Sequence, residues 1–374
     1  LVRAVANPTE PELLEAIQVR GGEHPVALGD VAEVYDSKAM TVGFGSAEAQ
    51  GEVMFAVAQL LRGADALGAV DQLRTKMDSV RDALPEGVDC IVGDLDDPAG
   101  YAALGQRHWD VVCQFKAYDL PRVEQDLAVF SGRCGQYVFI SSASAYQKPP
   151  RRVWLTEDVP LANPYWPYSQ AKADMERRLL EIHQAGQLPV TIVRPSHTNS
   201  GNLPGTFVPG DDIAWRMQQG RPVVSHGDGT SLWVLTAAED FAVPFVRLLG
   251  RREALGEAYH ITSDQPATWD EILGALAEAL GVRPEIVHVP TETLVRYNPD
   301  WSGPLLGDKA APVVFDNSKI KALVGEFPVT VDLAGQMRRG VAGLAERLAG
   351  SPRDKQLHAL LDRIASEQKA LGGR

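Results

Sequence analysis

The chain has 374 residues, of which 45% are hydrophobic and 23% charged, and its 36 lysines and arginines against 49 aspartates and glutamates give a net charge of −13. This apolar fraction is ordinary for a globular protein and excludes wholesale disorder, and the longest apolar runs are far too short to cross a bilayer. The acidic balance argues against broad contact with a phosphate backbone, so a nucleic-acid partner is not expected.

The three cysteines, Cys90, Cys113 and Cys134, cannot all pair, and none of them stands at the CxxC spacing of a zinc site. No basic-then-apolar leader opens the sequence. We therefore expect a cytoplasmic protein without a disulfide framework, a metal site or a membrane segment.

The first 37 residues differ in pattern from the rest of the chain. Thr9 and Glu12 stand three apart with Pro11 between them, a capping box that predicts a short helix through Ile17. Our interpretation of this extension is a packing arm or a clasp on a neighbouring molecule.

From residue 38 onward, short apolar strands alternate with helical stretches. A helix is predicted over residues 52–61, where four apolar residues from Val53 to Leu60 share one face. Short, continuously apolar strands separated by helices indicate a parallel sheet covered on both faces, so the predicted fold is α/β with a doubly wound sheet. The strands expected are residues 39–44, 90–92, 111–113, 137–140 and 190–193.

After Arg194 the sequence becomes rich in glycine and proline. A helix is predicted over residues 268–280, opened by a second capping box of Thr268 and Glu271. We expect this half to form a smaller, irregular lobe that caps the crevice at the carboxyl ends of the strands.

The end of the chain, residues 351–371, is predicted to be an amphipathic helix with Pro352 at its first position. Its spacing indicates a packing or oligomer element. The apolar stripe consists of Leu357, Leu360, Leu361 and Ile364.

Tyr168 and Lys172 stand four apart at the start of a predicted helix, so they lie one above the other on the same face. A tyrosine has an ordinary pKa of about 10, and an ammonium nearby favours the phenolate and lowers that pKa. Such a phenolate can take a proton from an alcohol while a hydride leaves its carbon. Alone, the pair is also explained as a helix-surface contact.

A serine-rich segment, residues 141–146, follows directly on a predicted strand. Because α/β folds place ligand-contacting groups at the carboxyl ends of central parallel strands, Ser142 is expected to hold the substrate oxygen for Tyr168. The alternative is that Ser141, Ser142 and Ser144 cap the backbone of a loop.

The order and spacing of the serine segment, the Tyr168-Ser-Gln-Ala-Lys172 motif and the strand ending at Pro195 resemble the extended short-chain dehydrogenase/reductases of the epimerase/dehydratase type. The resemblance runs from about residue 39 to residue 348 and implies a Rossmann-type fold, with Ser142, Tyr168 and Lys172 as the catalytic triad. Three later segments are similar to a bacterial branch akin to the chloroplast stem-loop RNA-binding proteins: residues 227–233, 258–264 and 314–319.

The resemblance also implies contacts on the nicotinamide and substrate side. Lys172 would bond the nicotinamide ribose, and Pro195 would border the nicotinamide. His197 falls where the family often has an asparagine near the substrate, although a lone histidine is also explained as a structural residue. Ser144 is taken as a second substrate contact.

Further contacts are implied on the adenosine side. Asp94 and Leu95 match the family positions that touch adenine, with an ordinary strand-end turn as the alternative. Ala117 occupies the segment that lines the cofactor in relatives, and Lys116 beside it points to an altered pocket.

The dinucleotide fingerprint of the family is altered in this chain. The family carries GxxGxxG, whose glycines let the pyrophosphate approach the backbone at a helix N-terminus. In the best register, Gly45 and Gly51 are kept and Glu48 takes the middle position. Its carboxylate would clash with a pyrophosphate and repel it, or turn away from the site.

The residue that would bond the adenosine ribose is Asp71, with Val70 as the alternative in a shifted register, and Arg74 nearby leaves NADP open. The expected cofactor is NAD or NADP, with NAD slightly favoured, and Glu48 leaves open whether binding is retained.

Relatives that act on nucleotide sugars commonly present an arginine to the diphosphate in the segment matching residues 229–233, which has none here. Arg216 or Arg221 would have to substitute. Three tryptophans are candidates either for stacking on a ring-shaped substrate or for the core: Trp154, Trp166 and Trp233.

The leading interpretation is an NAD(P)-dependent oxidoreductase or epimerase/dehydratase that acts on a secondary alcohol of a sugar or natural-product intermediate, with Tyr168 as base. The second keeps the fold but gives Tyr168 and Ser142 non-redox acid–base chemistry, a cyclisation, elimination or isomerisation, beside a dinucleotide site eroded by Glu48. The third, RNA binding, rests only on the resemblance to the RNA-binding branch, and the acidic charge opposes it.

The predicted organisation has four parts: an N-terminal extension (1–37), a Rossmann-type dinucleotide-binding domain (38–195), a mainly substrate-binding lobe with interleaved Rossmann elements (196–348) and a C-terminal amphipathic helix (349–374). The resemblance implies a homodimer through two helices of the α/β domain, one of them residues 168–181.

Overall fold

The computed structural model describes residues 101–349 and 353–372, and the backbone of four short strands before them. The four strands form two antiparallel pairs, β1 with β2 and β3 with β4. Their bounds are β1 (Gln18–Arg20), β2 (Pro25–Ala27), β3 (Gly45–Ala47) and β4 (Gly51–Val53).

The helix predicted over residues 52–61 is wrong at its start. Glu52 and Val53 are extended in β4, where Val53 lies opposite Gly45. A β-branched valine suits an extended backbone, and cross-strand pairing overrides the apolar spacing that favoured a helix. The rest of that helix, the short helix from Thr9 and the strands predicted at 39–44 and 90–92 lie outside the residues described, except for the backbone of the four short strands.

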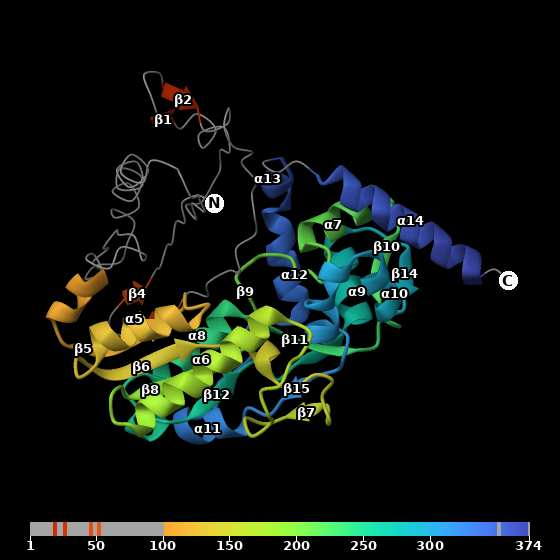
Figure 1. Cartoon of the computed structure of the whole chain (residues 1–374). Coiled ribbons are helices and arrows are strands. Elements are labelled where there is room, and N and C mark those ends of the chain that lie inside the picture. Colours follow the sequence, from red (N-terminus) through yellow and green to blue (C-terminus); the bar gives the residue numbers. More distant parts are fainter. Residues whose placement is uncertain are drawn as a thin grey trace.

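Four parallel strands form the central sheet in the order β12-β8-β6-β5 (Figure 1). Three predicted strands fall within β5, β6 and β8, and their parallel arrangement is confirmed. The bounds are β5 (Trp109–Gln114), β6 (Cys134–Ile140), β8 (Val190–Pro195) and β12 (Ala258–Ile261).

Helices α5 (Leu120–Phe130) and α6 (Pro167–Gln184) cover one face of this sheet (Figure 1). Side chains along a strand alternate between faces, so Tyr137 and Phe139 of β6 both point to this side. Both are fully buried in one apolar cluster with helical residues, which include Val123, Val129, Phe130, Met175, Leu179 and Ile182.

Helices α8 (Ala238–Leu248) and α11 (Ser318–Val324) cover the opposite face. They receive the other residues of β6, Val138 and Ile140, in a second apolar cluster. Both helices come from the second half of the chain, which therefore returns to the sheet after β8. The doubly wound α/β fold is thus confirmed, with the helices on both faces that a buried parallel sheet requires.

Most of the other described residues build a second lobe around its own apolar core, in which Trp269 is fully buried. Its strands pair as β13-β11-β9, β10-β14 and β15-β7. The strand bounds are β7 (Trp154–Leu155), β9 (His197–Asn199), β10 (Val223–His226), β11 (Leu232–Ala237), β13 (Pro266–Thr268), β14 (Ile286–Val289) and β15 (Val314–Phe315).

Five helices pack in this lobe beside the C-terminal helix (Figure 1). They are α7 (Gly210–Gln218), α9 (Trp269–Leu280), α10 (Thr291–Tyr297), α12 (Leu333–Ala342) and α13 (Leu344–Ala349). Short single turns connect the elements of both parts: η1 (Ala103–Gln106), η2 (Ala143–Ala145), η3 (Arg252–Ala254), η4 (Pro299–Ser302) and the π-helical η5 (Leu305–Lys309).

The capping box predicted for α9 is present in full. The Thr268 hydroxyl accepts a hydrogen bond from the Glu271 backbone N–H at 3.1 Å, and the Glu271 carboxylate accepts one from the Thr268 backbone N–H at 2.7 Å. Two otherwise unpaired backbone donors are thereby satisfied, which sets the first residue of the helix.

The C-terminal helix α14 (Lys355–Gly372) starts four residues later than predicted. Asp354 is the residue that opens it, because its carboxylate accepts hydrogen bonds from the N–H groups of Gln356 and Leu357 at 2.9 and 3.0 Å. The predicted apolar stripe does pack into the core of the lobe, with Leu361 and Ile364 buried. None of the described helices is long and apolar enough to cross a membrane.

Candidate active site

The serine segment turns sharply at the carboxyl end of β6, where three hydroxyl groups meet. Ser142 caps η2, and its Oγ accepts a hydrogen bond from the Ser144 backbone N–H at 3.2 Å. The Oγ atoms of Ser142 and Ser144 lie 2.9 Å apart, and Ser169 on α6 donates to Ser144 Oγ at 2.8 Å. The Ser142 hydroxyl therefore caps the loop, and the same oxygen lies beside the other hydroxyl groups of the candidate site.

The first turn of α6 brings the predicted tyrosine and lysine to the same place. Pro167 occupies the first position of the helix, where its missing N–H costs nothing. Tyr168 follows it and is hydrogen-bonded to Ser142. The ammonium nitrogen of Lys172 lies 5.8 Å from the centroid of the Tyr168 ring. The structure thus brings together Ser142, Tyr168 and Lys172, the three residues predicted to be catalytic.

Lys172 is held by the ends of two neighbouring strands. Its side chain is only 2% exposed, and its Nζ donates to the backbone carbonyl oxygens of Ala117 and Ile140, both at 2.8 Å. Burial lowers the pKa of Lys172 to about 7, and Lys116 adds to this while Glu176 opposes it. The amine is therefore close to half-protonated at neutral pH.

The pKa of Tyr168 differs from the expectation. Burial raises it well above its ordinary value, and Tyr118 and Asp308 add to the rise, whereas the hydrogen bond with Ser142 lowers it. Lys172 is not among the groups that lower this pKa, and desolvation of the phenol is the largest cause of the rise. The Tyr168 hydroxyl is consequently a protonated phenol at neutral pH.

Ala117, predicted to line the cofactor, is fully buried just beyond β5, and its carbonyl is fixed by Lys172. The backbone of this loop is held from the other side as well. Gln114 accepts a hydrogen bond from the Lys116 N–H and donates to Asp126, both at 2.7 Å. Asp126 is fully buried and also accepts from the hydroxyl groups of Tyr101 and Tyr137.

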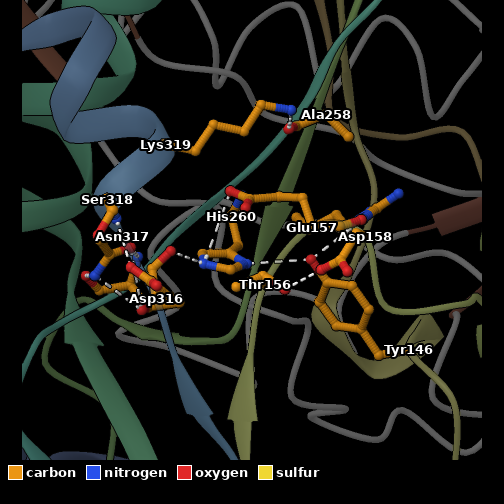
Figure 2. A network of polar contacts seen from close by, with 12 residues as sticks. Tyr146, Thr156, Glu157, Asp158, Ala258, His260, Asp316, Asn317, Ser318 and Lys319 are labelled. Atoms are coloured by element: carbon orange, nitrogen blue, oxygen red, sulfur yellow. Dashed lines mark hydrogen bonds and ion pairs between the residues drawn. The ribbon is translucent and has the colours of Figure 1, made fainter.

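A second polar network supports the serine turn from the substrate-lobe side (Figure 2). Tyr146 ends the turn, and its hydroxyl lies 3.1 Å from both Arg194 Nη1 and His260 Nδ1. Arg194 forms a buried ion pair with Glu176 of α6 at 2.6 Å. The helix that carries Tyr168 is thus tied to β8 and to the serine turn.

The histidine of this network has a defined tautomer. His260 Nε2 donates to the Asp316 backbone carbonyl at 2.5 Å, so Nδ1 is left to accept from the Tyr146 hydroxyl (Figure 2). Glu157 accepts a hydrogen bond from the His260 backbone N–H at 3.2 Å. Burial lowers the pKa of His260, in keeping with a neutral ring.

His197 lies in β9, just beyond Pro195 at the end of β8. Its Nδ1 accepts a hydrogen bond from the Trp233 indole N–H at 3.3 Å, which leaves Nε2 as the protonated nitrogen. Burial lowers the pKa of His197 to about 4, and the charge of Lys309 adds to this. The ring is therefore a neutral hydrogen-bond donor at physiological pH.

Residues that the sequence analysis missed come from the η5 turn. Asn163 donates to the backbone carbonyls of Ser144 at 2.7 Å and Gly307 at 2.6 Å, and so joins the turn to the serine segment. The following residues, Asp308 and Lys309, form an ion pair at 2.8 Å. About 140 residues separate Asn163 from the turn, and no motif marks either, so only the fold brings them together.

The arginines considered as diphosphate ligands are used elsewhere. Arg216 is 1% exposed and pairs with Asp362 of α14 at 2.6 Å, and Arg221 pairs with the same carboxylate. Both therefore hold the C-terminal helix against the lobe, and the proposal that either substitutes for the missing arginine is wrong.

The three tryptophans separate into different surroundings. Trp154 is 55% exposed, whereas Trp233 is buried against His197. Trp166 lies with its ring centroid 5.2 Å from that of Tyr168, at the start of α6.

Most of the residues predicted to contact the adenosine half of the cofactor lie outside the described residues. Gly45 and Gly51 are described by their backbone alone, in β3 and β4, with Gly51 opposite Ala47. The remaining positions of that side are not described: Glu48, Asp71, Asp94 and Leu95.

The comparisons with known proteins agree with this arrangement. Residues 122–262 match the model of the NAD dependent epimerase/dehydratase family. The chloroplast stem-loop binding protein of 41 kDa b from Arabidopsis thaliana is 28% identical over 189 residues, 50% of this chain and 47% of that protein. The 2′-dehydrokanamycin reductase of Streptomyces kanamyceticus is 26% identical over 214 residues, 56% of this chain and 59% of that protein. The matches thus span about half the length of these curated relatives.

Among solved structures, UDP-glucuronic acid 4-epimerase from Bacillus cereus, in complex with NAD, superposes with a TM-score of 0.57 at 18% identity. The match covers 74% of this chain and 85% of that one, and it shows the shared fold. The segment that matches the model of the NAD dependent epimerase/dehydratase family, residues 122–262, carries the serine turn, Tyr168 and Lys172.

Proposed function

We propose that the protein is an NAD(P)-dependent oxidoreductase or epimerase/dehydratase acting on a secondary alcohol, or the matching ketone, of a sugar or natural-product intermediate. The observation that carries the proposal is the meeting of Ser142, Tyr168 and Lys172 at the carboxyl ends of β5 and β6. This is the edge at which open α/β sheets bind their ligands.

The three residues have separate roles in this proposal. Ser142 donates a hydrogen bond to the substrate oxygen and orients it toward Tyr168. In the direction of reduction, the Tyr168 phenol, which is protonated at neutral pH, gives its proton to that oxygen. In the direction of oxidation, the Tyr168 phenolate takes the proton back, and a protonated Lys172 lowers the cost of the phenolate charge.

Three described residues fit the nicotinamide half of a dinucleotide: Lys172, Ala117 and Pro195. Lys172 uses two of its three N–H donors on backbone carbonyls, which leaves one for a ribose hydroxyl. Ala117 and Pro195 would border the same group. When bound, the nicotinamide supplies or accepts the hydride. NAD is slightly favoured over NADP.

The first test replaces Tyr168 with phenylalanine. Turnover of the cognate substrate should fall by about a thousandfold or more, because the proton donor is lost, while dinucleotide affinity changes little. Calorimetric titration with NAD⁺, NADH, NADP⁺ and NADPH measures the affinity, and a Tyr165→Phe variant, whose ring is 37% exposed, is the matched control. Turnover equal to wild type in the Tyr168 variant would overturn the mechanism.

The same titration distinguishes a second candidate function. A protonated Tyr168 beside a partly neutral Lys172 also suits non-redox acid–base chemistry, such as an elimination or an isomerisation. If none of the four dinucleotides binds, and the purified protein carries none, hydride transfer is refuted and this second function takes its place.

We propose further that the protein is a cytoplasmic homodimer, that α6 contributes to the dimer interface, and that the four-part division at residues 37, 195 and 348 describes its domains. The support is the family's usual arrangement and the exposed outer side of α6. Light scattering of the full chain tests the dimer: a monomer mass would refute it.

A further inference from the structure

The η5 turn carries one buried lysine, Lys309, and contacts a second, Lys148, near the candidate active site. The η5 turn packs closely against the residues before α6. A Cβ atom added at Gly307 would lie only 3.1 Å from the Cβ atom of Trp166. The Trp166 ring in turn contacts Tyr168, and Asn163 fixes the Gly307 carbonyl. The position of Lys309 is therefore set relative to Tyr168.

Hydrogen bonds to the Lys309 carbonyl also hold the backbone of the η5 turn. The Lys309 carbonyl lies 3.1 Å from His226 Nε2 and accepts from the Ser231 hydroxyl at 3.2 Å. The Lys309 ammonium lies 5.2 Å above the ring of Trp233, the residue that also holds His197. Lys309 thus shares an aromatic neighbour with the candidate substrate-binding histidine.

The charges at this turn do not balance. Lys148 is 4% exposed, and its Nζ donates to the Asp308 backbone carbonyl at 3.0 Å. Lys309 is 8% exposed and pairs with the Asp308 carboxylate at 2.8 Å. Among residues 101–349 and 353–372, Asp308 is the one carboxylate within ion-pair distance of either ammonium. In the part of the chain that the structure describes, two buried lysine side chains therefore share a single carboxylate as neighbour.

An excess buried charge is costly unless a partner satisfies it. Each ammonium has three donors, and one of each is used on Asp308. Burial lowers the pKa of Lys148, Asp308 opposes this, and Lys309 adds to the lowering. A negatively charged group bound here would remove the imbalance and take up the remaining donors.

The charges of the η5 turn also affect the pKa values of Tyr168 and His197. The Asp308 carboxylate contributes to the raised pKa of Tyr168, and Lys309 to the lowered pKa of His197. Arg216 and Arg221 both pair with Asp362 and do not take part in this turn.

We propose that Lys309 and Lys148 recognise an oxyanion, a carboxylate or a phosphate, on the small molecule that binds at Tyr168. This proposal rests on the proposed function for the identity of the site, and it narrows the substrate class from sugars in general to acidic ones. Asp308 holds the two lysines in place and keeps the turn folded until the anion binds.

The experiment is calorimetric titration of the full chain, in a buffer free of phosphate, with three probes: D-glucuronate, D-glucose 6-phosphate and neutral D-glucose. The wild type should bind one of the two anions at least about tenfold more tightly than glucose. A preference between the two identifies the oxyanion as carboxylate or phosphate.

Two variants with opposite expected effects separate recognition from structural support. Lys309→Met should weaken binding of the anion about tenfold or more, because a charge-assisted hydrogen bond is lost. Asp308→Asn should strengthen it, because the competing carboxylate is removed. A merely structural role would weaken binding in both. Lys148→Met provides a second loss of charge should Lys309→Met fail to fold.

Lys319→Met is the matched control, since Lys319 is a surface lysine paired with Glu257 and should leave binding unchanged. The proposal is overturned if glucose binds as tightly as the anions, if neither anion binds at about 10 mM, or if Asp308→Asn weakens binding as Lys309→Met does. None of these measurements needs dinucleotide or turnover, so they stand apart from the Tyr168→Phe test.

Discussion

At the scale of single residues, Lys172 shows how burial changes a group that the motif alone describes as a cation. The Tyr168–Lys172 spacing predicts correctly that the two side chains share a helix face. The spacing contains no information on solvent, however. The two carbonyls that accept from the Lys172 nitrogen, from Ala117 and Ile140, come from other parts of the chain, and burial at this place lowers the pKa of Lys172.

This burial predicts a dependence of stability on pH. The pKa of Lys172 falls from its ordinary value of 10.5 to about 7 in the folded protein, so between these values the unfolded chain binds more protons. Stability contributed by this group should therefore rise with pH across that window, by about 1.4 kcal/mol per pH unit.

Urea unfolding of wild type and Lys172→Met between pH 7 and pH 9.5 measures it, because other titrating groups cancel in the difference. Wild type should gain stability relative to the variant as the pH rises. A difference that stays constant with pH would show that the folded-state pKa is not lowered. Lys319→Met, an exposed lysine, should show no such trend.

At the scale of elements, α14 illustrates what an apolar stripe predicts and what it leaves open. The spacing of Leu357, Leu361 and Ile364 identified the buried face correctly. The spacing did not show that this face packs on the lobe around β10 and β14. Nor did it show the ion pairs at Asp362, because the arginines that form them lie some 140 residues earlier in the chain.

Truncating this face should destabilise the lobe. Leu361 is 1% exposed, and Leu361→Ala should cost about 2–4 kcal/mol of unfolding free energy, since it removes buried methyl groups and leaves a cavity. Leu371 on the same helix is 67% exposed, and Leu371→Ala should cost less than about 0.5 kcal/mol. Equal losses measured by chemical denaturation would mean that α14 is not packed as described.

At the scale of the whole molecule, one buried ion pair connects the sheet, α6 and the serine turn. The guanidinium of Arg194 lies between Glu176 and the Tyr146 hydroxyl. His260 of β12 completes the network through its contact with the same hydroxyl (Figure 2). The side chains of Arg194 and Glu176 are 6% and 1% exposed. A carboxylate as buried as that of Glu176 stays charged at low cost only while Arg194 is paired with it.

Arg194→Met should therefore cost about 3–5 kcal/mol, because it leaves the Glu176 charge buried and unpaired. Arg177 pairs with Asp174 on the outer side of α6, and its side chain is 68% exposed. Arg177→Met should change stability by less than about 1 kcal/mol. If the double change Arg194→Met with Glu176→Gln recovers much of the loss, the unpaired charge is its cause; a double variant as unstable as Arg194→Met would argue against this.

The sequence by itself determined the doubly wound sheet, the apolar face of α14, the capping box of α9 and the closeness of Ser142, Tyr168 and Lys172. These follow from local rules, since periodicity, capping and motif spacing act over a few residues.

The tertiary structure alone decided the rest. The raised pKa of Tyr168, the Asn163 bridge, and the charge imbalance at Lys148 and Lys309 all join segments more than 100 residues apart. Burial and Coulomb interaction depend on distance in space and on excluded water, and a linear pattern encodes neither. That is why the chemistry of the site could be named from the sequence, while its protonation states and its surplus positive charge could not.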